Sequence, residues 1–431
     1  MSSLPVVVGL LLSAASDPPS ALSLQDALAL AEQHDARLLR SRISVEVSRA
    51  RALQETLRLL PVVDLGASLT QNPREVSANG RVVTPLTVPQ GTAQGRFTLI
   101  DGQAVPGAVA SVVEDKAFGL EQREGRDALR ADVATAYLAL AEAQALTDAA
   151  ARATATAREL LRVTEARARL GDALLLDVQA ARAEVLRLEA DEANVTGLEM
   201  QAAALLALRL GVDDTEGLHA QCDSCVPLPP RAEVGAVTGV DVTLSLPART
   251  DLQALRLRYD AAEWQKAGSW FEFVPELALV GNARLQQPTL FTPDPLWWSA
   301  QVVASWRLFE GGARAMRVKE RGARSRAAAG AAARGADEAA VEVRQAEAAL
   351  DAALAAERAA TARVELSEAA LAQARLRYEQ GLLSAFDISE VARRAAEADA
   401  QGIQSRFRRE RAVLRLRRAL GLGVLDDGEQ G

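Results

Sequence analysis

An internal duplication constrains the fold of this chain more than any other feature of its sequence. The segment ARLGDALLLDV places Gly171 six residues before Asp177, and the segment RYEQGLLSAFDI places Gly381 six residues before Asp387. The two glycines are 210 residues apart, and so are the two aspartates. Such a constant spacing between matched motifs predicts a repeated structural unit.

Two further pairs of motifs keep nearly the same spacing. Each half closes on Leu-Gly, at 210–211 and at 420–421, and the upstream motifs LIDG and LFEG begin at residues 99 and 308. We therefore expect two tandem repeats, over residues about 22–212 and 250–421. The segment 213–249, which contains several prolines, reads as a linker between them.

Each repeat is predicted to contain a helix, two strands, a very long helix and another helix. The long helices are expected over about 103–170, 175–210, 310–378 and 385–420. Apolar and small residues alternate at spacings of four and three, a heptad seam typical of coiled coils. The seam of the first repeat is Leu129, Val133, Ala136, Leu140, Ala143, Thr147, Ala150, Thr154, Ala157, Leu161, Thr164 and Ala168, and that of the second runs from Val343 to Tyr378.

The strands are expected over about 62–70, 92–100, 276–285 and 297–309. Apolar and polar residues alternate in all four, as in membrane strands that face lipid on one side and a lumen on the other. Trp298 and Trp306 share a face and lie about 26 Å apart along a strand. This distance matches the aromatic girdles at the two edges of a membrane barrel. The alternative interpretation is a soluble sandwich with two core tryptophans.

Four strands are too few to close a barrel, because the smallest barrels use about eight. Open strand edges are not tolerated in lipid. A membrane barrel would therefore have to be assembled from several copies of the chain, so we expect a homo-oligomer.

The two ends of the chain carry their own signals. Residues 1–16 contain a short apolar run followed by small residues, as in a signal peptide, although no Lys or Arg precedes the run. Residues 422–431 are expected to form a disordered tail. The chain contains no apolar run long enough for a membrane helix.

The sequence offers little support for an enzyme or a nucleic-acid-binding protein. The net charge is −8, and neither histidine lies in a nucleophile or metal motif, so we expect no cofactor and no nucleic-acid partner. The segment HAQCDSC could hold a metal or act as a redox pair. A local disulfide between Cys222 and Cys225 is the interpretation that we favour for an oxidising compartment.

Taken together, these motifs resemble the TolC family of outer-membrane efflux proteins over about residues 22–422. The resemblance rests on LSLQDALALAEQHD, on LLPVVDLGAS and FVPELALVGNA, on LIDGQ and LFEGG, and on GDALLLDVQAARAE and RYEQGLLSAFDISE. It implies a mainly α-helical fold with membrane β-strands. It also implies a homotrimer that shares a twelve-stranded β-barrel continued by an α-helical coiled-coil tunnel. A periplasmic adaptor protein and an inner-membrane pump would be its partners.

The resemblance also suggests roles for individual residues. Gly171 and Gly381 would form the turns at the periplasmic tips. Asp177 and Tyr378 would make the repeat-to-repeat hydrogen bonds that close the entrance, and Asp387 and Glu390 would form acidic rings that narrow the pore. Helix capping by the two aspartates and simple packing of Tyr378 are the alternatives.

We therefore expect a passive conduit of a tripartite efflux pump or a type I secretion system, in the outer membrane and extending into the periplasm. A non-conducting coiled-coil tether of the envelope is the alternative function. A soluble scaffold that is not exported is a third hypothesis.

Overall fold

The computed structural model describes residues 22–78, 81–212, 218–222, 225–228, 249–287 and 294–425. These residues belong to two compact units. The sheet unit comprises residues 40–123 and 249–337, and the tip unit comprises the rest of the chain. The expected signal peptide at 1–16 and most of the expected linker at 213–249 lie outside the described residues.

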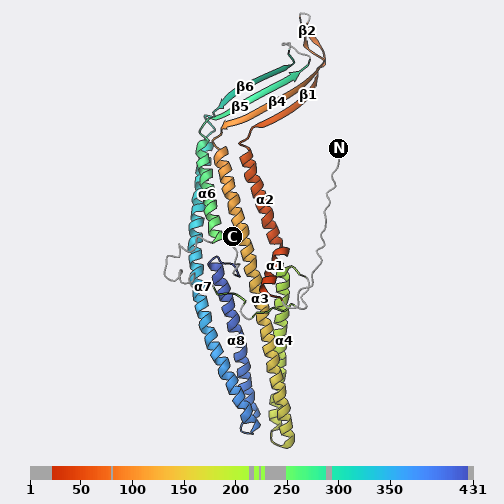
Figure 1. Cartoon of the computed structure of the whole chain (residues 1–431), viewed down its shortest axis with the longest axis vertical. Coiled ribbons are helices and arrows are strands. Elements are labelled where there is room, and N and C mark those ends of the chain that lie inside the picture. The colour runs from red at the N-terminus through yellow and green to blue at the C-terminus, as the bar shows by residue number, and fades with distance from the viewer. Residues whose placement is uncertain are drawn as a thin grey trace. The chain divides into compact units, whose positions relative to one another are not determined.

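The sheet unit is built around four antiparallel strands in the order β1-β4-β5-β6 (Figure 1). They are β1 (Val62–Gln71), β4 (Thr87–Ile100), β5 (Glu276–Gln286) and β6 (Leu296–Ser305). A small hairpin of β2 (Val76–Ala78) and β3 (Arg81–Thr84) lies between β1 and β4 in the sequence. Both repeats therefore contribute two neighbouring strands to one sheet.

The register of the strands separates apolar from polar side chains across the whole sheet. Leu65 lies opposite Ala93, Ala93 opposite Ala283, and Ala283 opposite Trp298. Because successive side chains of a strand point to opposite faces, one face is entirely uncharged. We call it the apolar face. It consists of the odd-numbered residues from Val63 to Leu69 in β1, from Pro89 to Phe97 in β4 and from Leu277 to Leu285 in β5, and of the even-numbered residues from Leu296 to Ala304 in β6.

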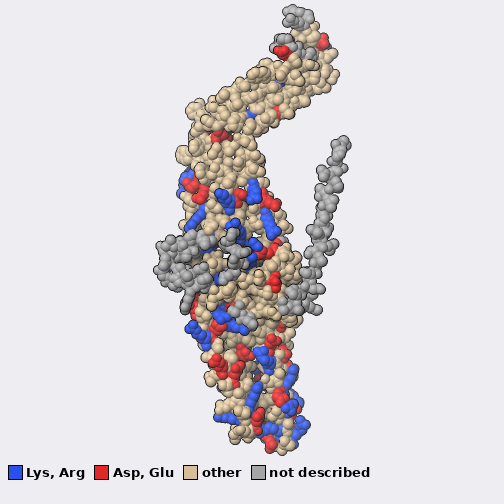
Figure 2. Space-filling model, viewed as in Figure 1, with Lys and Arg blue, Asp and Glu red and all other residues tan. Residues whose placement is uncertain are grey.

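The opposite face of the sheet is mainly polar. It carries Asp64, Ser68 and Thr70, with glutamine, threonine and asparagine side chains on the strands beside them. Arg96 and Glu276 form an ion pair of 2.5 Å on this face. In Figure 2 the sheet is almost entirely free of charged surface, whereas charged side chains gather on the helices.

Helices α2 (Ala36–Leu57) and α6 (Thr250–Phe271) complete the sheet unit with the first parts of α3 (Ala104–Leu170) and α7 (Ala313–Glu379). We expected the helix of the second repeat to start at about 310, but α7 begins at Ala313. Gly311 and Gly312 have φ values of 61° and 84°, outside the helical region. Glu310 accepts a hydrogen bond of 2.8 Å from Arg317 in the first turns of α7, which fixes the passage from strand to helix.

The tip unit contains α1 (Leu24–His34), α4 (Leu175–Leu210), α8 (Ala385–Ala419) and the last parts of α3 and α7. Its core follows the predicted heptad seams: Leu129, Val133, Leu140, Val343 and Leu350 are all buried. Burial alone would raise the pKa of Glu32 on α1, but hydrogen bonds from Arg126 and Arg130 on α3 hold it below its ordinary value. These ion pairs tie α1 to α3.

Several boundaries differ from those expected. The opening helix of the first repeat is divided at Asp35, whose backbone is extended with φ −73° and ψ 115°. The strand expected over about 297–309 ends at Ser305, and the one expected over about 92–100 begins at Thr87. Residues 422–425, expected in the disordered tail, have defined positions: Val424 is buried, and the carbonyl of Gly423 accepts a hydrogen bond from Arg417.

Among the described helices, none carries an apolar stretch long enough to cross a lipid bilayer.

Candidate functional site at the helix tips

The two turns that join the long helices have the same backbone geometry. Gly171 ends α3 with a φ of 87°, and Gly381 ends α7 with a φ of 77°, a region that favours glycine. In the first turn the amide of Asp172 donates to the carbonyl of Arg167 over 2.9 Å. In the second, the amide of Leu382 donates to the carbonyl of Arg377 over the same distance. Both turns are therefore Schellman motifs, which satisfy the last carbonyls of each helix.

The two predicted tip aspartates both cap a helix. The Asp387 carboxylate accepts a hydrogen bond of 2.6 Å from the Ser384 hydroxyl. In return, the oxygen of that hydroxyl accepts a hydrogen bond of 3.2 Å from the backbone amide of Asp387. The carboxylate of Asp177 accepts the amide of Leu174 over 3.0 Å. Leu174 has no side-chain acceptor, so α4 has only half of the reciprocal capping box that α8 has.

Tyr378 connects the two repeats. Its side chain is 4% exposed, and its hydroxyl lies 2.8 Å from the hydroxyl of Thr164, which is fully buried on α3. Thr164 also lies 2.8 Å from the carbonyl of Leu160, to which it donates its single proton. Tyr378 is therefore the donor of the bond between α7 and α3, and Thr164 is its acceptor.

Arg167 adds a second connection between these helices. Its Nη1 donates to the backbone carbonyl of Tyr378 over 2.9 Å, and its guanidinium lies 4.8 Å from the centre of the tyrosine ring. A cation near a helix C-terminus interacts favourably with the free carbonyls there. Around this contact, Ala374, Tyr378, Ala385 and Ile388 form a buried cluster against Leu160, Val163, Leu383 and Val391.

Tyr378 thus makes hydrogen bonds between the repeats, but its partners are Thr164 and Arg167. In the described residues Asp177 forms no hydrogen bond with Tyr378 and acts only at the start of its own helix. Thr164 gave only a weak signal in the sequence, because it is one of three threonines on a seam of small and apolar residues. Arg167 gave none, since a charged residue beside a seam is ordinarily solvated.

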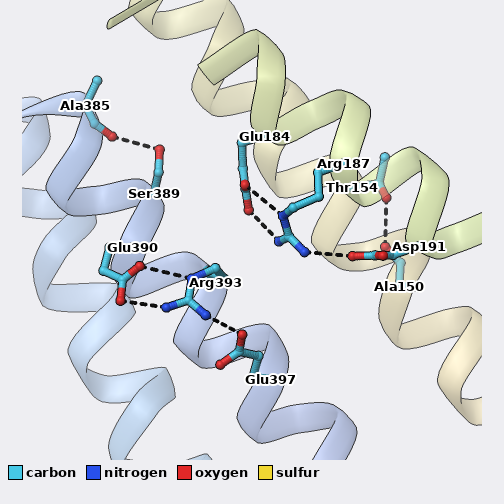
Figure 3. A network of polar contacts seen from close by, with 10 residues as sticks. All are labelled: Ala150, Thr154, Glu184, Arg187, Asp191, Ala385, Ser389, Glu390, Arg393 and Glu397. Atoms are coloured by element: carbon cyan, nitrogen blue, oxygen red, sulfur yellow. Dashed lines mark hydrogen bonds and ion pairs between the residues drawn. The ribbon is translucent and has the colours of Figure 1, made fainter. Parts of the chain in front are cut away.

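Glu390 belongs to a network of ion pairs on α8 (Figure 3). Its carboxylate pairs with Arg393 over 2.7 Å and with Arg394 over 2.8 Å. The hydrogen bonds from Arg393 hold the pKa of Glu390 below its ordinary value. Glu390 is therefore ionised, but its charge is balanced by neighbours on the same helix, unlike Asp387, which has no basic partner among the described residues.

A similar arrangement lies on α4, which contacts α8. There Arg187 pairs with Glu184 over 2.6 Å and with Asp191 over 2.7 Å (Figure 3). On α8, Arg393 also pairs with Glu397, so on each helix one arginine lies between two acidic residues, at spacings of three and four residues. Such pairs stabilise the helix that carries them.

The remaining predicted residues are not part of the two turns. Trp298 lies on the apolar face of β6 and is 71% exposed. Trp306 follows the end of β6, and its indole N–H donates to the carbonyl of Phe273 over 3.1 Å. Cys222 and Cys225 are joined as a disulfide in the part of the linker that the structure describes.

Residues 242–422 match the outer membrane efflux protein family. The chain shares its fold with the outer membrane protein VceC from Vibrio cholerae, at 21% identity and a TM-score of 0.78, over 93% of this chain and 96% of that one. It is also similar to a membrane protein from Pseudomonas aeruginosa, at 23% identity and a TM-score of 0.79, over 94% of this chain and 92% of that one. A third similar structure is the Neisseria gonorrhoeae MtrE outer membrane channel, at 19% identity and a TM-score of 0.76, over 97% of this chain and 95% of that one. A comparison with curated protein sequences finds no match. Residues 242–422 are thus similar to the outer membrane efflux protein family, and over nearly its whole length the chain has the fold of these solved outer-membrane proteins.

Proposed function

We propose that the chain forms a passive channel across the outer membrane, serving a tripartite efflux pump or a type I secretion system. The observation that carries this proposal is the apolar face of the sheet. Leu65 of β1 is 81% exposed and Trp298 of β6 is 71% exposed, and both lie on one uncharged surface that extends over four strands. A soluble protein would cover such a surface, whereas a membrane strand presents it to lipid.

The edges of the sheet support an assembly of several copies. In the described residues, β1 and β6 each have one neighbouring strand in the four-stranded sheet. Their free edges carry unpaired backbone groups, which are costly in lipid. Pairing of β6 in one copy with β1 of the next would satisfy them. We propose a homotrimer with a twelve-stranded barrel, in which Trp298 and Trp306 mark the two edges of the lipid-facing band.

The helices of the tip unit would form the wall of a periplasmic conduit, with its entrance at the turns of Gly171 and Gly381. The contact of Tyr378 with Thr164 and Arg167 would hold the two helical hairpins of one chain together in the closed state. The carboxylates of Asp387, Glu390 and Asp177 would line the constriction. A periplasmic adaptor protein and an inner-membrane pump would supply the substrate.

A conductance experiment with a matched pair of variants tests the channel. Val302 lies on the apolar face of β6, and its neighbour Gln301 lies on the polar face. An arginine on the lipid face near the bilayer centre costs about 2–4 kcal/mol, while a lumen position tolerates it. In planar bilayers the wild-type protein and Gln301→Arg should conduct, whereas Val302→Arg should fail to insert.

Two outcomes would contradict the proposal. If well-folded wild-type oligomer gives no current, the non-conducting tether becomes the better interpretation. If both variants insert equally well, the sheet does not face lipid as proposed.

A further inference from the structure

A short segment of the linker contacts both repeats within the tip unit. This segment, residues 218–222 and 225–228 of the described chain, is called the strap here. Leu218 and Val226 near its two ends are buried. A linker that only connected two domains would remain solvated, so its burial requires an explanation.

The first half of the strap is bound to α3 of the first repeat. Gln144 uses both ends of its amide: its Nε2 donates to the carbonyl of Leu218 over 3.0 Å, and its Oε1 accepts the amide of Ala220 over 3.0 Å. The buried hydroxyl of Tyr137 lies 2.8 Å from the carbonyl of Gln221. These contacts hold residues 218–221 against one face of α3.

The second half is bound to α8 of the second repeat by buried charged groups. Glu410 and Arg417 are both 2% exposed. The carboxylate of Glu410 accepts the amide of Val226 over 3.1 Å, and Arg417 donates to the carbonyl of Pro227 over 3.2 Å. Release of this half would take a hydrogen-bond donor away from a buried carboxylate, which is costly.

The disulfide lies between the two bound halves. Cys222 and Cys225 have Cα atoms 5.2 Å apart, and Arg406 of α8 donates to the carbonyl of Cys222 over 3.0 Å. We propose that this disulfide is a clamp that keeps the strap bound to α3 and α8 at the same time, and so ties the first repeat to the second. The bond acts by restricting the released strap, whose backbone has fewer conformations when the loop is closed.

Hydrogen exchange at two amides tests the clamp. The amide of Ala220 reports the bond to α3, and the amide of Val226 reports the bond to α8. The disulfide closes a loop of four residues, Cys222 to Cys225, and so lowers the entropy of the released strap. This makes the released state up to about 20-fold less populated than it is without the disulfide. In the Cys222→Ser/Cys225→Ser variant, both amides should therefore exchange up to about 20-fold faster than in the wild-type protein. The amide of Leu382 at the distant α7 turn serves as the internal control and should not change.

Chemical reduction provides the same test without a mutation. A phosphine breaks the S–S bond of the folded wild-type chain; one water molecule supplies the protons of the two thiols and the oxygen of the phosphine oxide that forms. The two amides should then respond as in the double variant. Unchanged exchange at Val226 after complete reduction would overturn the proposal, and so would two free thiols in the unfolded, unreduced chain. The measurement needs no bilayer, so its outcome is independent of the conductance experiment.

Discussion

The hydrogen bond between Tyr378 and Thr164 permits a quantitative prediction about the closed tips. Tyr378→Phe removes the donor, but Thr164 keeps its own bond to the carbonyl of Leu160. No buried proton loses its acceptor, so the cost is that of one net hydrogen bond, about 1 kcal/mol. This corresponds to a roughly fivefold increase in local opening of the tip.

Substitution of the other partner of this hydrogen bond should cost more free energy. Thr164→Val removes the acceptor and leaves the Tyr378 hydroxyl buried without a partner, at a cost of about 1–3 kcal/mol. We therefore expect Thr164→Val to open the tip more than Tyr378→Phe does. The double variant should cost less than the sum of the two, because both single changes remove the same bond.

Hydrogen exchange at the α7–α8 turn measures this opening. The amides of Gly381 and Leu382 are bonded to the last turn of α7, so they exchange when the turn opens. Tyr259→Phe is the matched control, because the hydroxyl of Tyr259 has no hydrogen-bond partner among the described residues. Equal effects of Tyr378→Phe and Tyr259→Phe, or a harmless Thr164→Val, would refute the reasoning.

Three further predictions concern acid stability, the membrane face and the constriction. The pKa of Glu32 is lower in the folded chain than its ordinary value of 4.5, so its contribution to stability is complete above about pH 4.5 and is lost as the pH falls through the folded pKa. The unfolding temperature, measured by circular dichroism, should therefore fall more steeply with decreasing pH in the wild-type protein than in Glu32→Gln. Parallel curves of unfolding temperature against pH would contradict this. Brominated lipid should quench the fluorescence of a variant that retains only Trp298 more than that of one that retains only Trp297, which lies on the opposite face; equal quenching would exclude a lipid-facing apolar surface. Asp387→Asn keeps an acceptor for the helix cap but removes the charge, so it should lower the cation selectivity of the channel with little loss of stability; unchanged selectivity would leave Asp387 as a cap only.

Features that depend on neighbours in the sequence could be predicted. The ends of α3 and α7 follow from Gly171 and Gly381, because each glycine lies in a left-handed conformation that stops the helix. The capping bonds of Asp387 and Asp177 involve residues only three positions away. Helix capping could therefore be recognised from the sequence as an alternative role for the two aspartates. The similarity to outer membrane efflux proteins was equally accessible, because the resemblance rested on the order of short motifs.

Features that depend on distant residues could not be predicted. Tyr378 was considered both as a residue that bonds to the other repeat and as a packing residue, and its partners Thr164 and Arg167 were not recognised. They lie more than 200 residues away, and α3 and α7 had to be placed side by side before the contact existed. The interruption at Asp35 was also missed, because the residues around it read as one helical pattern.

The sequence by itself determined the periodicities: a heptad seam in the long helices and alternation in the strands. These arise from the geometry of a single element, which each residue obeys through its near neighbours. Only the tertiary structure decided the strand register that joins four short apolar stripes into one uncharged face, the partners of Tyr378, and the binding of the strap to both repeats. Each of these requires two segments to meet, and a chain's local pattern does not specify which segments do so.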